Sequence, residues 1–332
     1  MLKNILMIST GGTIACQPQE DGGLAPAITS EQLIREVPEL SEICNIDCYQ
    51  LYNVDSTNMG PENWKGIVKT ITTNLGKYDG FVITHGTDTM AYTAAALSYM
   101  IQNPPVPIVF TGSQKSIALR DTDARNNLLC AFRYAASDGA WGVQIAFDGE
   151  IILGTRARKV RSKSFNAFAS IGYPDTAIIR DDRVIQYMPR PAVWRSLRTY
   201  ENMNSRVFVI RLIPGISLDI LNYMKENYDA IVIEAFGVGG LPNYNNGALL
   251  KAIKDWTDCG KLAVFSTQVQ FEGSDIGVYE VGRIFKDYPG IIEAKDMTPE
   301  AIATKLMWVL AQTTDREEAE KLFLTPIQND IL

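Results

Sequence analysis

Histidine is the rarest residue type in this chain of 332 residues, and His85 is the only one. Histidine is the usual general base near neutral pH and the commonest protein metal ligand. Cys44 and Cys48 have C-x-x-x-C spacing, but the single histidine lies about 40 residues away. We therefore predict no metal site and no cofactor. Whether His85 is a catalytic base depends on the residues around it.

Long apolar stretches are also missing, since none approaches the roughly 20 residues that cross a membrane. The start, MLKNILMISTGG, lacks the apolar region of a secretory signal. The five cysteines are odd in number and scattered, which indicates reduced thiols rather than a disulfide framework. They are Cys16, Cys44, Cys48, Cys130 and Cys259. The expected location is the cytoplasm.

Positive charge is in deficit, with 31 Lys and Arg against 38 Asp and Glu and a net charge of −7. This balance argues against non-specific binding to nucleic acids or to anionic membranes. The phosphate-binding patterns G-x-G-x-x-G and G-x-x-x-x-G-K-[ST] are absent too. We predict partners that are neither nucleic acid nor membrane.

What is present suits a globular core, because 46% of the residues are hydrophobic and 21% are charged. The length predicts about two domains of ~150 residues. Apolar runs alternate with helical segments, which predicts an α/β fold with parallel strands covered on both faces. Strands are expected at 4–9, 80–84, 107–111, 143–147, 207–212, 230–235 and 261–266. Helices are expected at 89–102, 121–137, 217–226, 246–258 and 298–313.

The alternation breaks from about residue 180 to 206, where charges gather and prolines stand at 189 and 191. This composition predicts a linker or connecting arm. We assign residues 1–190 to a larger N-terminal α/β domain with a mostly parallel sheet. Residues 191–206 are the linker, and residues 207–332 form a smaller C-terminal α/β domain.

Three polar segments follow expected strands of the N-terminal domain. They are Thr10–Thr13, Thr84–Asp88 and Thr111–Ser113. Ligands of open parallel sheets gather beyond the carboxyl ends of the strands. We therefore expect these segments to meet at one site.

A chemical and a structural interpretation compete for the polar residues. Thr13 is either a reactive hydroxyl or the cap of a plain turn, and Asp88 is either a catalytic carboxylate or a helix N-cap. His85 is either the base of a nearby threonine or a ring that supports the turn. The segment RARKVRSK is either a solvated loop or the source of a basic lysine, for which Lys159 and Lys163 are both eligible.

Several motifs occur in the same order as in one protein family. They are TGGTIA at 10–15, VDSTNM at 54–59, THGTDTMAY at 84–92, TGS at 111–113, G-x-x-x-x-K at 154–159, IPGIS at 213–217, FGVGGLP at 236–242 and DMT at 296–298. With these motifs, which span nearly the whole chain, the sequence resembles the bacterial-type L-asparaginases. Its length and its start resemble their cytoplasmic type I branch and its archaeal relatives. The resemblance implies the two-domain asparaginase fold.

The resemblance implies hydrolysis of the side-chain amide of L-asparagine to L-aspartate and ammonia. An amide is a poor electrophile, so an activated nucleophile and an oxyanion site are both needed. Thr13 matches the family's nucleophile, which forms a β-acyl-enzyme. Thr87, Asp88 and Lys159 match its triad, in which the lysine accepts a proton from the threonine. The sequence leaves open which threonine attacks first, and it makes His85 a support for the turn.

The same resemblance implies how the amino acid is held. Asp88 is also a partner for the α-amino group, and Ser56 with the neighbouring backbone amides suits the α-carboxylate. Backbone N–H groups near Thr87 suit the oxyanion and the leaving amide. The implied substrate-binding residues are Gly12, Asp55, Ser56, Thr57, Gly86 and Ser113.

Two departures from the family pattern stand out. Where relatives often carry a lid tyrosine, this chain has GGLAP with Leu24 at the matching place. We hypothesise that Tyr279 of a neighbouring subunit supplies that hydroxyl, the alternative being a rim tyrosine without a catalytic part. Arg158 and Val269 replace a threonine and a cysteine of the allosteric asparagine site in certain type I relatives. We expect that site to be absent or changed.

Three alternatives to an asparaginase remain. A glutaminase-asparaginase acts on both amides, and an amidase subunit of a tRNA-dependent amidotransferase usually has an added N-terminal domain. The first expected strand begins at residue 4, which leaves no room for that domain. A non-catalytic amino-acid-binding module is the third alternative. The family is oligomeric, so a homodimer or homotetramer is expected.

Overall fold

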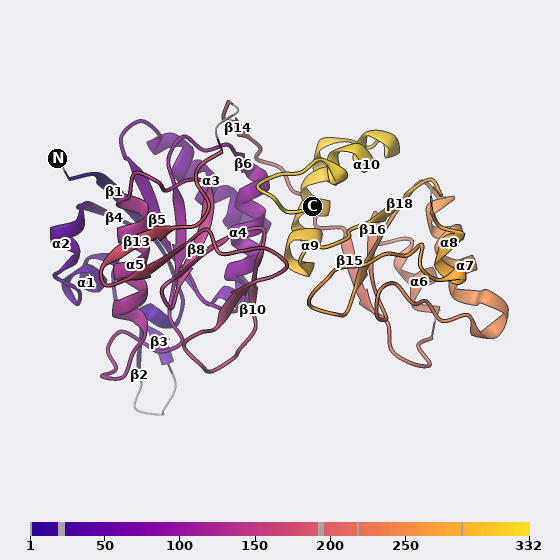
Figure 1. The fold of residues 1–332 in the computed structure, drawn as a ribbon, viewed down its shortest axis with the longest axis horizontal. Helices are drawn as coiled ribbons and strands as arrows, with labels where there is room; N and C mark the ends of the chain where they lie inside the picture. Colours follow the sequence, from indigo (N-terminus) through magenta and orange to yellow (C-terminus); the bar gives the residue numbers. More distant parts are fainter. Residues whose placement is uncertain (1, 19–23, 192–195, 218, 287) are drawn as a thin grey trace. The chain divides into compact units, whose positions relative to one another are not determined.

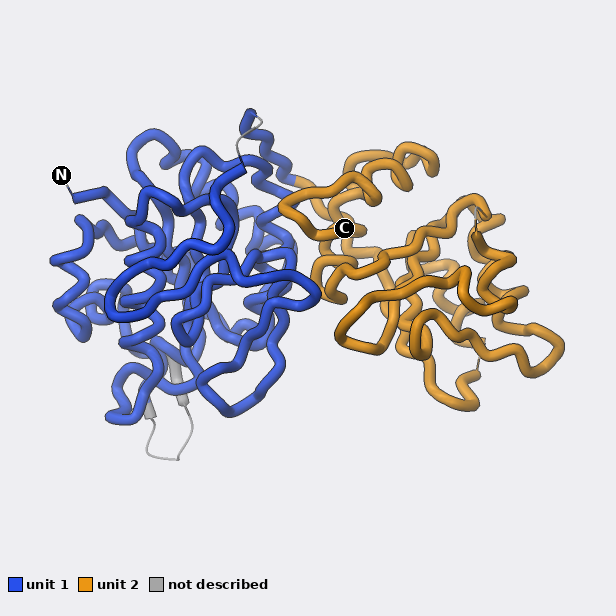
Figure 2. The backbone as a smooth tube through the Cα atoms, viewed as in Figure 1, with its two compact units in different colours: residues 1–201 blue, residues 202–332 orange. Residues whose placement is uncertain are grey.

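The computed structural model describes residues 2–18, 24–191, 196–217, 219–286 and 288–332. The chain forms two compact units, residues 1–201 and 202–332 (Figure 2). The boundary falls inside the segment 191–206 that the sequence marks as a linker. No helix among the described residues is long and apolar enough to cross a membrane.

Unit 1 is built on an eight-stranded mixed sheet (Figure 1). In spatial order its strands are β13 (Arg183–Gln186), β12 (Ala177–Arg180), β9 (Glu150–Leu153), β8 (Val143–Phe147), β7 (Ile108–Thr111), β5 (Gly80–Thr84), β1 (Asn4–Gly11) and β4 (Asn45–Val54). The strands from β8 to β4 pair in parallel, whereas β9, β12 and β13 pair antiparallel. The expected α/β fold is confirmed, with a sheet that is parallel on the side that carries β1 and β5.

The four strands expected in this unit are present. All five residues of β5 are buried, as are all five of β8, and β1 is buried after its first residue. A strand covered by helices on both faces has to be apolar on both faces. This is why continuous apolar runs predicted these strands well.

Two edge strands lack a continuous apolar run and were not predicted from the sequence. The sequence of β4, NIDCYQLYNV, is partly or fully exposed along its whole length. Residues 183–186, which we expected in a connecting arm, instead form β13 and pair with β12. This correction has the same cause, because a strand at the edge of a sheet covers less apolar surface and keeps charges such as Arg183 in water.

Helices cover both faces of this sheet (Figure 1). On one face, α1 (Ser30–Arg35), α2 (Leu40–Ile43) and α5 (Ala124–Ala136) share a core with strand side chains such as Met7 and Val82. The helices α3 (Pro61–Asn74) and α4 (Met90–Met100) pack against each other, and α4 contacts β8. The small residues of α4 are buried nearly all round, as expected for a helix enclosed by its neighbours.

Short elements complete unit 1. The two-stranded ladders are β2 (Cys16–Pro18) with β3 (Leu24–Pro26), β10 (Ala157–Lys159) with β11 (Phe168–Ser170), and β6 (Ile101–Gln102) with β14 (Arg198–Thr199). The 3-10 turns η1 (Thr13–Ala15) and η2 (Ser56–Asn58) follow β1 and β4. The β10–β11 ladder positions a functional residue because it carries Lys159.

Unit 2 contains a four-stranded parallel sheet. Its strands in spatial order are β15 (Val207–Arg211), β16 (Ala230–Ala235), β17 (Leu262–Thr267) and β18 (Ile291–Glu293). Its helices are α6 (Asp219–Met224), α7 (Tyr244–Thr257), α8 (Glu280–Arg283), α9 (Pro299–Gln312) and α10 (Arg316–Leu324). The three expected strands and three expected helices are confirmed. Residues 245–247 have positive φ, so regular helix in α7 begins only after Gly247.

Candidate active site

The three polar segments of unit 1 meet at the carboxyl ends of β1, β5 and β7. The backbone N–H of His85 donates to the carbonyl of Thr111 at 2.9 Å, and the Thr10 hydroxyl donates to the carbonyl of Thr84 at 2.9 Å. The three strands are parallel neighbours, so their ends share one edge of the sheet. The expected convergence is confirmed.

Two glycines let these segments approach until their backbones touch. Gly12 has a φ of +87°, and a Cβ there would lie 2.4 Å from the backbone nitrogen of Gly86. A Cβ on Gly86 would lie 2.7 Å from both Cβ and Oγ of Ser56. A side chain at either position would push apart the segments that follow β1, β5 and β4.

A cavity of about 210 Å³ opens where these segments meet. Its lining residues are Gly12, Thr13, Cys16, Val54, Asp55, Ser56, Gly86, Thr87 and Asp88. All of these except Cys16 and Val54 belong to the predicted site. The volume lies below the range that holds drug-sized ligands, so it suits a small polar molecule.

Lys159 reaches Thr87 and Asp88 from the β10–β11 ladder. Its Nζ donates to Thr87 Oγ1 at 2.8 Å and to Asp88 Oδ1 at 2.7 Å. The Lys159 side chain is 18% exposed and that of Asp88 is 60% exposed, so water screens the ion pair from the Asp88 side. Lys163, the other lysine of the cation-rich segment, is exposed. The arrangement is a lysine in contact with both a hydroxyl and a carboxylate, the three kinds of group found in hydrolytic triads.

Thr13 opens the turn η1 directly after β1. It lies half-buried at the cavity wall, and its hydroxyl makes no hydrogen bond within the described residues. The Sγ atom of Cys16 donates to the carbonyl of Gly12 at 3.4 Å. Burial, and then the Asp55 carboxylate, raises the pKa of the Cys16 thiol, which disfavours a thiolate. Thr13 and Cys16 thus present a hydroxyl and a protonated thiol at the cavity wall.

The segment after β4 presents Asp55 and Ser56 to the cavity. Oδ1 of Asp55 accepts hydrogen bonds from N and Oγ1 of Thr57 at 2.8 and 2.9 Å, so the Thr57 amide is engaged within its own turn. Ser113 is buried, and its hydroxyl donates to the carbonyl of Lys115. The structure thus leaves Thr57 and Ser113 beside the cavity rather than in its wall.

His85 lies behind the cluster and is fully buried. Its Nδ1 donates to the carbonyl of Gly86 at 2.7 Å, and its ring meets Phe110 edge-on with 6.0 Å between centroids. Burial lowers the pKa of His85 to about 4, against a smaller opposing effect of that hydrogen bond. The ring is neutral near pH 7. The prediction that it ties down the turn is confirmed.

Sequence reasoning missed Gln114, which directly follows the TGS motif. The Thr87 hydroxyl donates to Gln114 Oε1 at 3.2 Å. The backbone N–H of Gln114 donates to the Asp123 carboxylate at 2.9 Å, and Asn127 Nδ2 donates to the same carboxylate at 3.1 Å. In the sequence, the only indication that Gln114 belongs to the site was its position just past the end of an expected strand.

Comparison with known families covers nearly the whole chain. The family model described as "Asparaginase, N-terminal" matches residues 4–192, and that described as "Glutaminase/Asparaginase C-terminal domain" matches residues 206–323. The chain belongs to the asparaginase family. The motifs quoted from the sequence, which resemble this family, lie within those two matches.

Individual relatives are similar over nearly the whole of this chain. The L-asparaginase of Thermococcus kodakarensis is 40% identical over 328 residues, which covers 98% of each chain. A Glutamyl-tRNA(Gln) amidotransferase subunit of Pyrococcus furiosus is 36% identical over 99% of this chain and 77% of that protein. The solved T. kodakarensis structure matches with a TM-score of 0.91 at 38% identity, over 99% of each chain. L-asparaginase I from Vibrio cholerae matches with a TM-score of 0.89 at 30% identity, over 100% of each chain.

The two residues connected with the missing lid tyrosine, Leu24 and Tyr279, belong to different units. Leu24 begins β3, while Gly22 and Gly23 of the same lid segment lie outside the described residues. Tyr279 belongs to unit 2, where it directly precedes α8 and is 49% exposed. This exposure leaves its ring accessible to another molecule.

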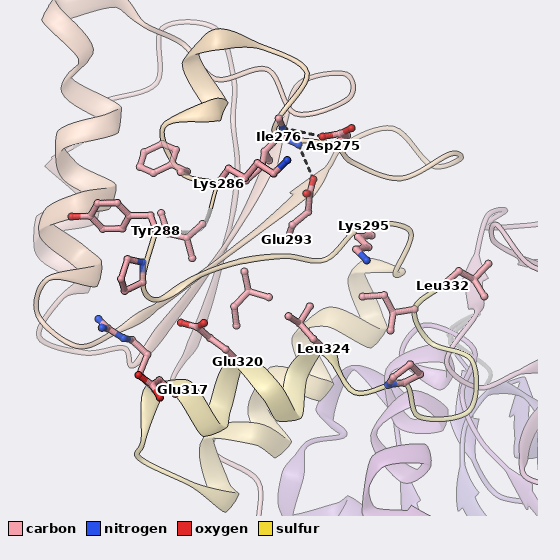
Figure 3. Close-up of a pocket in the computed structure, with 18 residues that line it drawn as sticks. Asp275, Ile276, Lys286, Tyr288, Glu293, Lys295, Glu317, Glu320, Leu324 and Leu332 are labelled. Atoms are coloured by element: carbon pink, nitrogen blue, oxygen red, sulfur yellow. Dashed lines mark hydrogen bonds between the residues drawn. The ribbon is translucent and has the colours of Figure 1, made fainter.

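Unit 2 contains a larger cavity, of about 670 Å³ (Figure 3). Glu293 and Glu320 face it, and each accepts a hydrogen bond from a backbone N–H, of Ile276 at 2.8 Å and of Gly290 at 2.7 Å. None of the predicted site residues lines this cavity. In the described parts of both units, no cluster of three or more His, Cys, Asp or Glu could hold a metal ion.

Proposed function

We propose that the protein is an L-asparagine amidohydrolase, which converts L-asparagine to L-aspartate and ammonia. The observation that carries the proposal is the contact of Lys159 with both Thr87 and Asp88, at a cavity onto which Thr13 also opens. This set offers a nucleophile, a proton acceptor and an orienting carboxylate. Membership of the asparaginase family and the L-asparaginases among its relatives support the proposal.

In the proposed first half-reaction, the Thr13 oxygen attacks the side-chain amide carbon of asparagine. A C–O bond forms, the C–N bond breaks, and the hydroxyl proton ends on the nitrogen that leaves as ammonia. In the second half-reaction, water attacks the resulting ester carbon, and one of its protons returns to the Thr13 oxygen. In each half, Thr87 gives its proton to a neutral Lys159 across their 2.8 Å contact and takes up the proton that Thr13 or water loses; the reverse transfers then deliver a proton to the leaving group.

The charged ends of the substrate have partners at the cavity. Lys159 occupies Oδ1 of Asp88, so we assign Oδ2 to the α-ammonium group. Ser56 and the backbone amides beside it receive the α-carboxylate. Backbone N–H groups near Thr87 and Ser113 stabilise the oxyanion. The scheme uses no metal and no cofactor.

Ammonia release tests the activity. The purified protein is expected to release ammonia and L-aspartate in equal amounts from L-asparagine. Acid quenching and mass spectrometry are expected to find the acyl adduct on the peptide that contains Thr13, and Thr13→Ala should remove it. Folded protein that releases no ammonia would overturn the activity. An adduct on Thr87 would overturn only the choice of nucleophile.

A second candidate is amide hydrolysis within a tRNA-dependent amidotransferase, favoured by the 36% identity to the amidotransferase subunit of P. furiosus. A glutaminase-asparaginase is a related alternative, because one methylene in an apolar pocket is worth only about 1–3 kcal/mol. The ratio of kcat/KM for asparagine and glutamine, measured without tRNA or a partner protein, separates these. Folded protein that binds L-aspartate without hydrolysing asparagine would be an amino-acid-binding module instead.

We further infer a cytoplasmic enzyme of the type I branch that works as a homodimer or homotetramer. Similarity to L-asparaginase I of V. cholerae along the whole chain supports the branch. Five free cysteines suit a reducing compartment. In this assembly, Tyr279 of one protomer supplies a hydroxyl beside Thr13 of its neighbour.

A further inference from the structure

Gln114 joins the two elements that bring Lys159 to Thr87. Its Oε1 accepts a hydrogen bond from the Thr87 hydroxyl at 3.2 Å, and its Nε2 donates to the carbonyl of Ser164 at 3.2 Å. Ser164 lies in the connection between β10 and β11, the ladder that carries Lys159. One amide side chain therefore ties the threonine to the loop beside the lysine.

The orientation of the Gln114 amide is fixed by its neighbours. Nε2 also faces the carbonyl of Arg161 at 3.5 Å, so a flipped amide would set Oε1 against two carbonyl oxygens. The group presented to Thr87 is consequently an acceptor. The backbone at Gln114 is also fixed, because the N–H groups of Gln114 and Lys115 both donate to the carboxylate of the buried Asp123.

The single hydroxyl hydrogen of Thr87 can point either to Gln114 Oε1 or to Lys159 Nζ. As an ammonium, Lys159 donates to Thr87 Oγ1, so the hydroxyl hydrogen points to Gln114 instead. Transfer of that hydrogen to Lys159 requires a neutral amine and a turn of the hydroxyl away from Gln114. We propose that Gln114 is a positioning residue that fixes the Thr87 oxygen and favours the resting pair of ammonium and hydroxyl.

This inference rests on the proposed amidohydrolase activity, and two variants of Gln114 test it. Gln114→Met keeps the length of the side chain but removes the acceptor toward Thr87 and the donor toward Ser164. We expect kcat to fall about 10- to 100-fold with a much smaller change in KM, because the hydroxyl is no longer held in line. The acid limb of the pH–rate profile should move to lower pH, because the ammonium form of Lys159 is no longer favoured.

Gln114→Glu keeps an acceptor toward Thr87, adds a negative charge and replaces the donor toward Ser164 with an oxygen. The charge favours the ammonium form of Lys159, so the acid limb should move to higher pH. Asp88 contacts Lys159 Nζ, Asp55 lines the same cavity and Arg161 lies on the same loop. These charged groups are unchanged in both variants, so opposite shifts report on residue 114 alone.

Ser164→Ala is the matched control, because Gln114 contacts only the backbone carbonyl of that residue. Calorimetric binding of L-aspartate shows whether each variant site is folded. Acid limbs that stay in place, or that move in the same direction in both variants, would overturn the inference. Wild-type protein that releases no ammonia would overturn the proposed function instead, so the two failures are distinguishable.

Discussion

At the residue scale, the site depends on which lysine of a cation-rich segment meets Thr87. Lys159 does so through β10, whereas Lys163 is exposed in the connection that follows. Spacing alone left both lysines eligible, and the match to the G-x-x-x-x-K motif pointed to Lys159. The pairing of strands decides which side chain turns inward.

Lys159→Met should lower kcat/KM for asparagine by about 10²–10⁴-fold, because the proton acceptor for Thr87 is lost. Thr87→Val should have a comparable effect, since it removes the hydroxyl at the other end of that contact. Lys163→Met removes a positive charge four residues away and should leave turnover near the wild-type value. Steady-state ammonia release measures all three. Equal losses at positions 159 and 163 would contradict the assignment.

The buried His85 predicts a pH dependence of stability. Its pKa is about 4 in the folded protein, against about 6.5 for an unperturbed histidine in an unfolded chain. Between these values the unfolded chain binds the proton and the folded protein does not. The neutral, buried His85 therefore makes its full contribution to the free energy of unfolding above about pH 6.5. About 3 kcal/mol of that free energy is lost as the pH falls from 6.5 to 4.

Urea unfolding of wild type and His85→Gln at several pH values checks this dependence. At pH 7 the variant should be less stable by about 1 kcal/mol, because the hydrogen bond to Gly86 is weakened. The difference should shrink or reverse toward pH 4, because the variant has no imidazole to protonate. Other titrating groups are common to both proteins and cancel. A difference that does not vary with pH would rule out this account.

At the element scale, the site is a packing of strand ends. The segments after β1, β5 and β4 touch through Gly12, Gly86 and Ser56, and a Cβ on Gly86 would lie 2.7 Å from the Ser56 side chain. We expect Gly86→Ala to cost about 1–3 kcal/mol of stability from overpacking. It should also lower kcat/KM about 100-fold, because Thr87 is displaced.

Gly60→Ala is the control for this experiment. Gly60 precedes α3 with an extended backbone, and an added Cβ would meet no atom within 4 Å. Because Gly60 is the N-cap of α3 and alanine caps less well than glycine, we expect a loss of up to about 1 kcal/mol in stability, with turnover near the wild-type value. Thermal unfolding together with ammonia release compares the two variants. Full activity in Gly86→Ala would show that the segments can separate without harm to the site.

At the scale of the whole molecule, the proposed assembly predicts that a neighbouring protomer completes the site. Tyr279 is 49% exposed in unit 2, and the lid segment of unit 1 has no tyrosine. If Tyr279 serves a neighbour, Tyr279→Phe and Lys159→Met should each be inactive alone. Mixed in equal amounts under conditions that exchange protomers, they should recover about a quarter of wild-type activity, because hybrid dimers contain one intact site.

A mixture that gains no activity, while native mass spectrometry shows hybrid dimers, would exclude a shared site. Unchanged turnover in Tyr279→Phe alone would remove the tyrosine from the mechanism. Either result leaves the Lys159, Thr87 and Asp88 cluster intact, because all three residues belong to unit 1.

The sequence by itself determined the α/β class, most of the buried parallel strands and the polar segments at their ends, although it missed the buried antiparallel strand β9. These features follow from local patterns, since a strand covered on both faces is apolar throughout and a glycine turn follows it. The edge strands β4 and β13 were missed because partial exposure leaves no such pattern. Family resemblance, rather than spacing, supplied the roles of Thr13 and Lys159.

Only the tertiary structure decided which side chains share the site and how. It placed Asp55 and Ser56 in the cavity wall. It also showed that the Thr57 amide donates to Asp55 rather than into the cavity, which a sequence motif does not reveal. It brought Gln114 to Thr87 across 27 positions of the chain. The physical reason is that hydrogen bonds between side chains depend on strand order and on the close approach of backbones, which arise only when distant segments pack together.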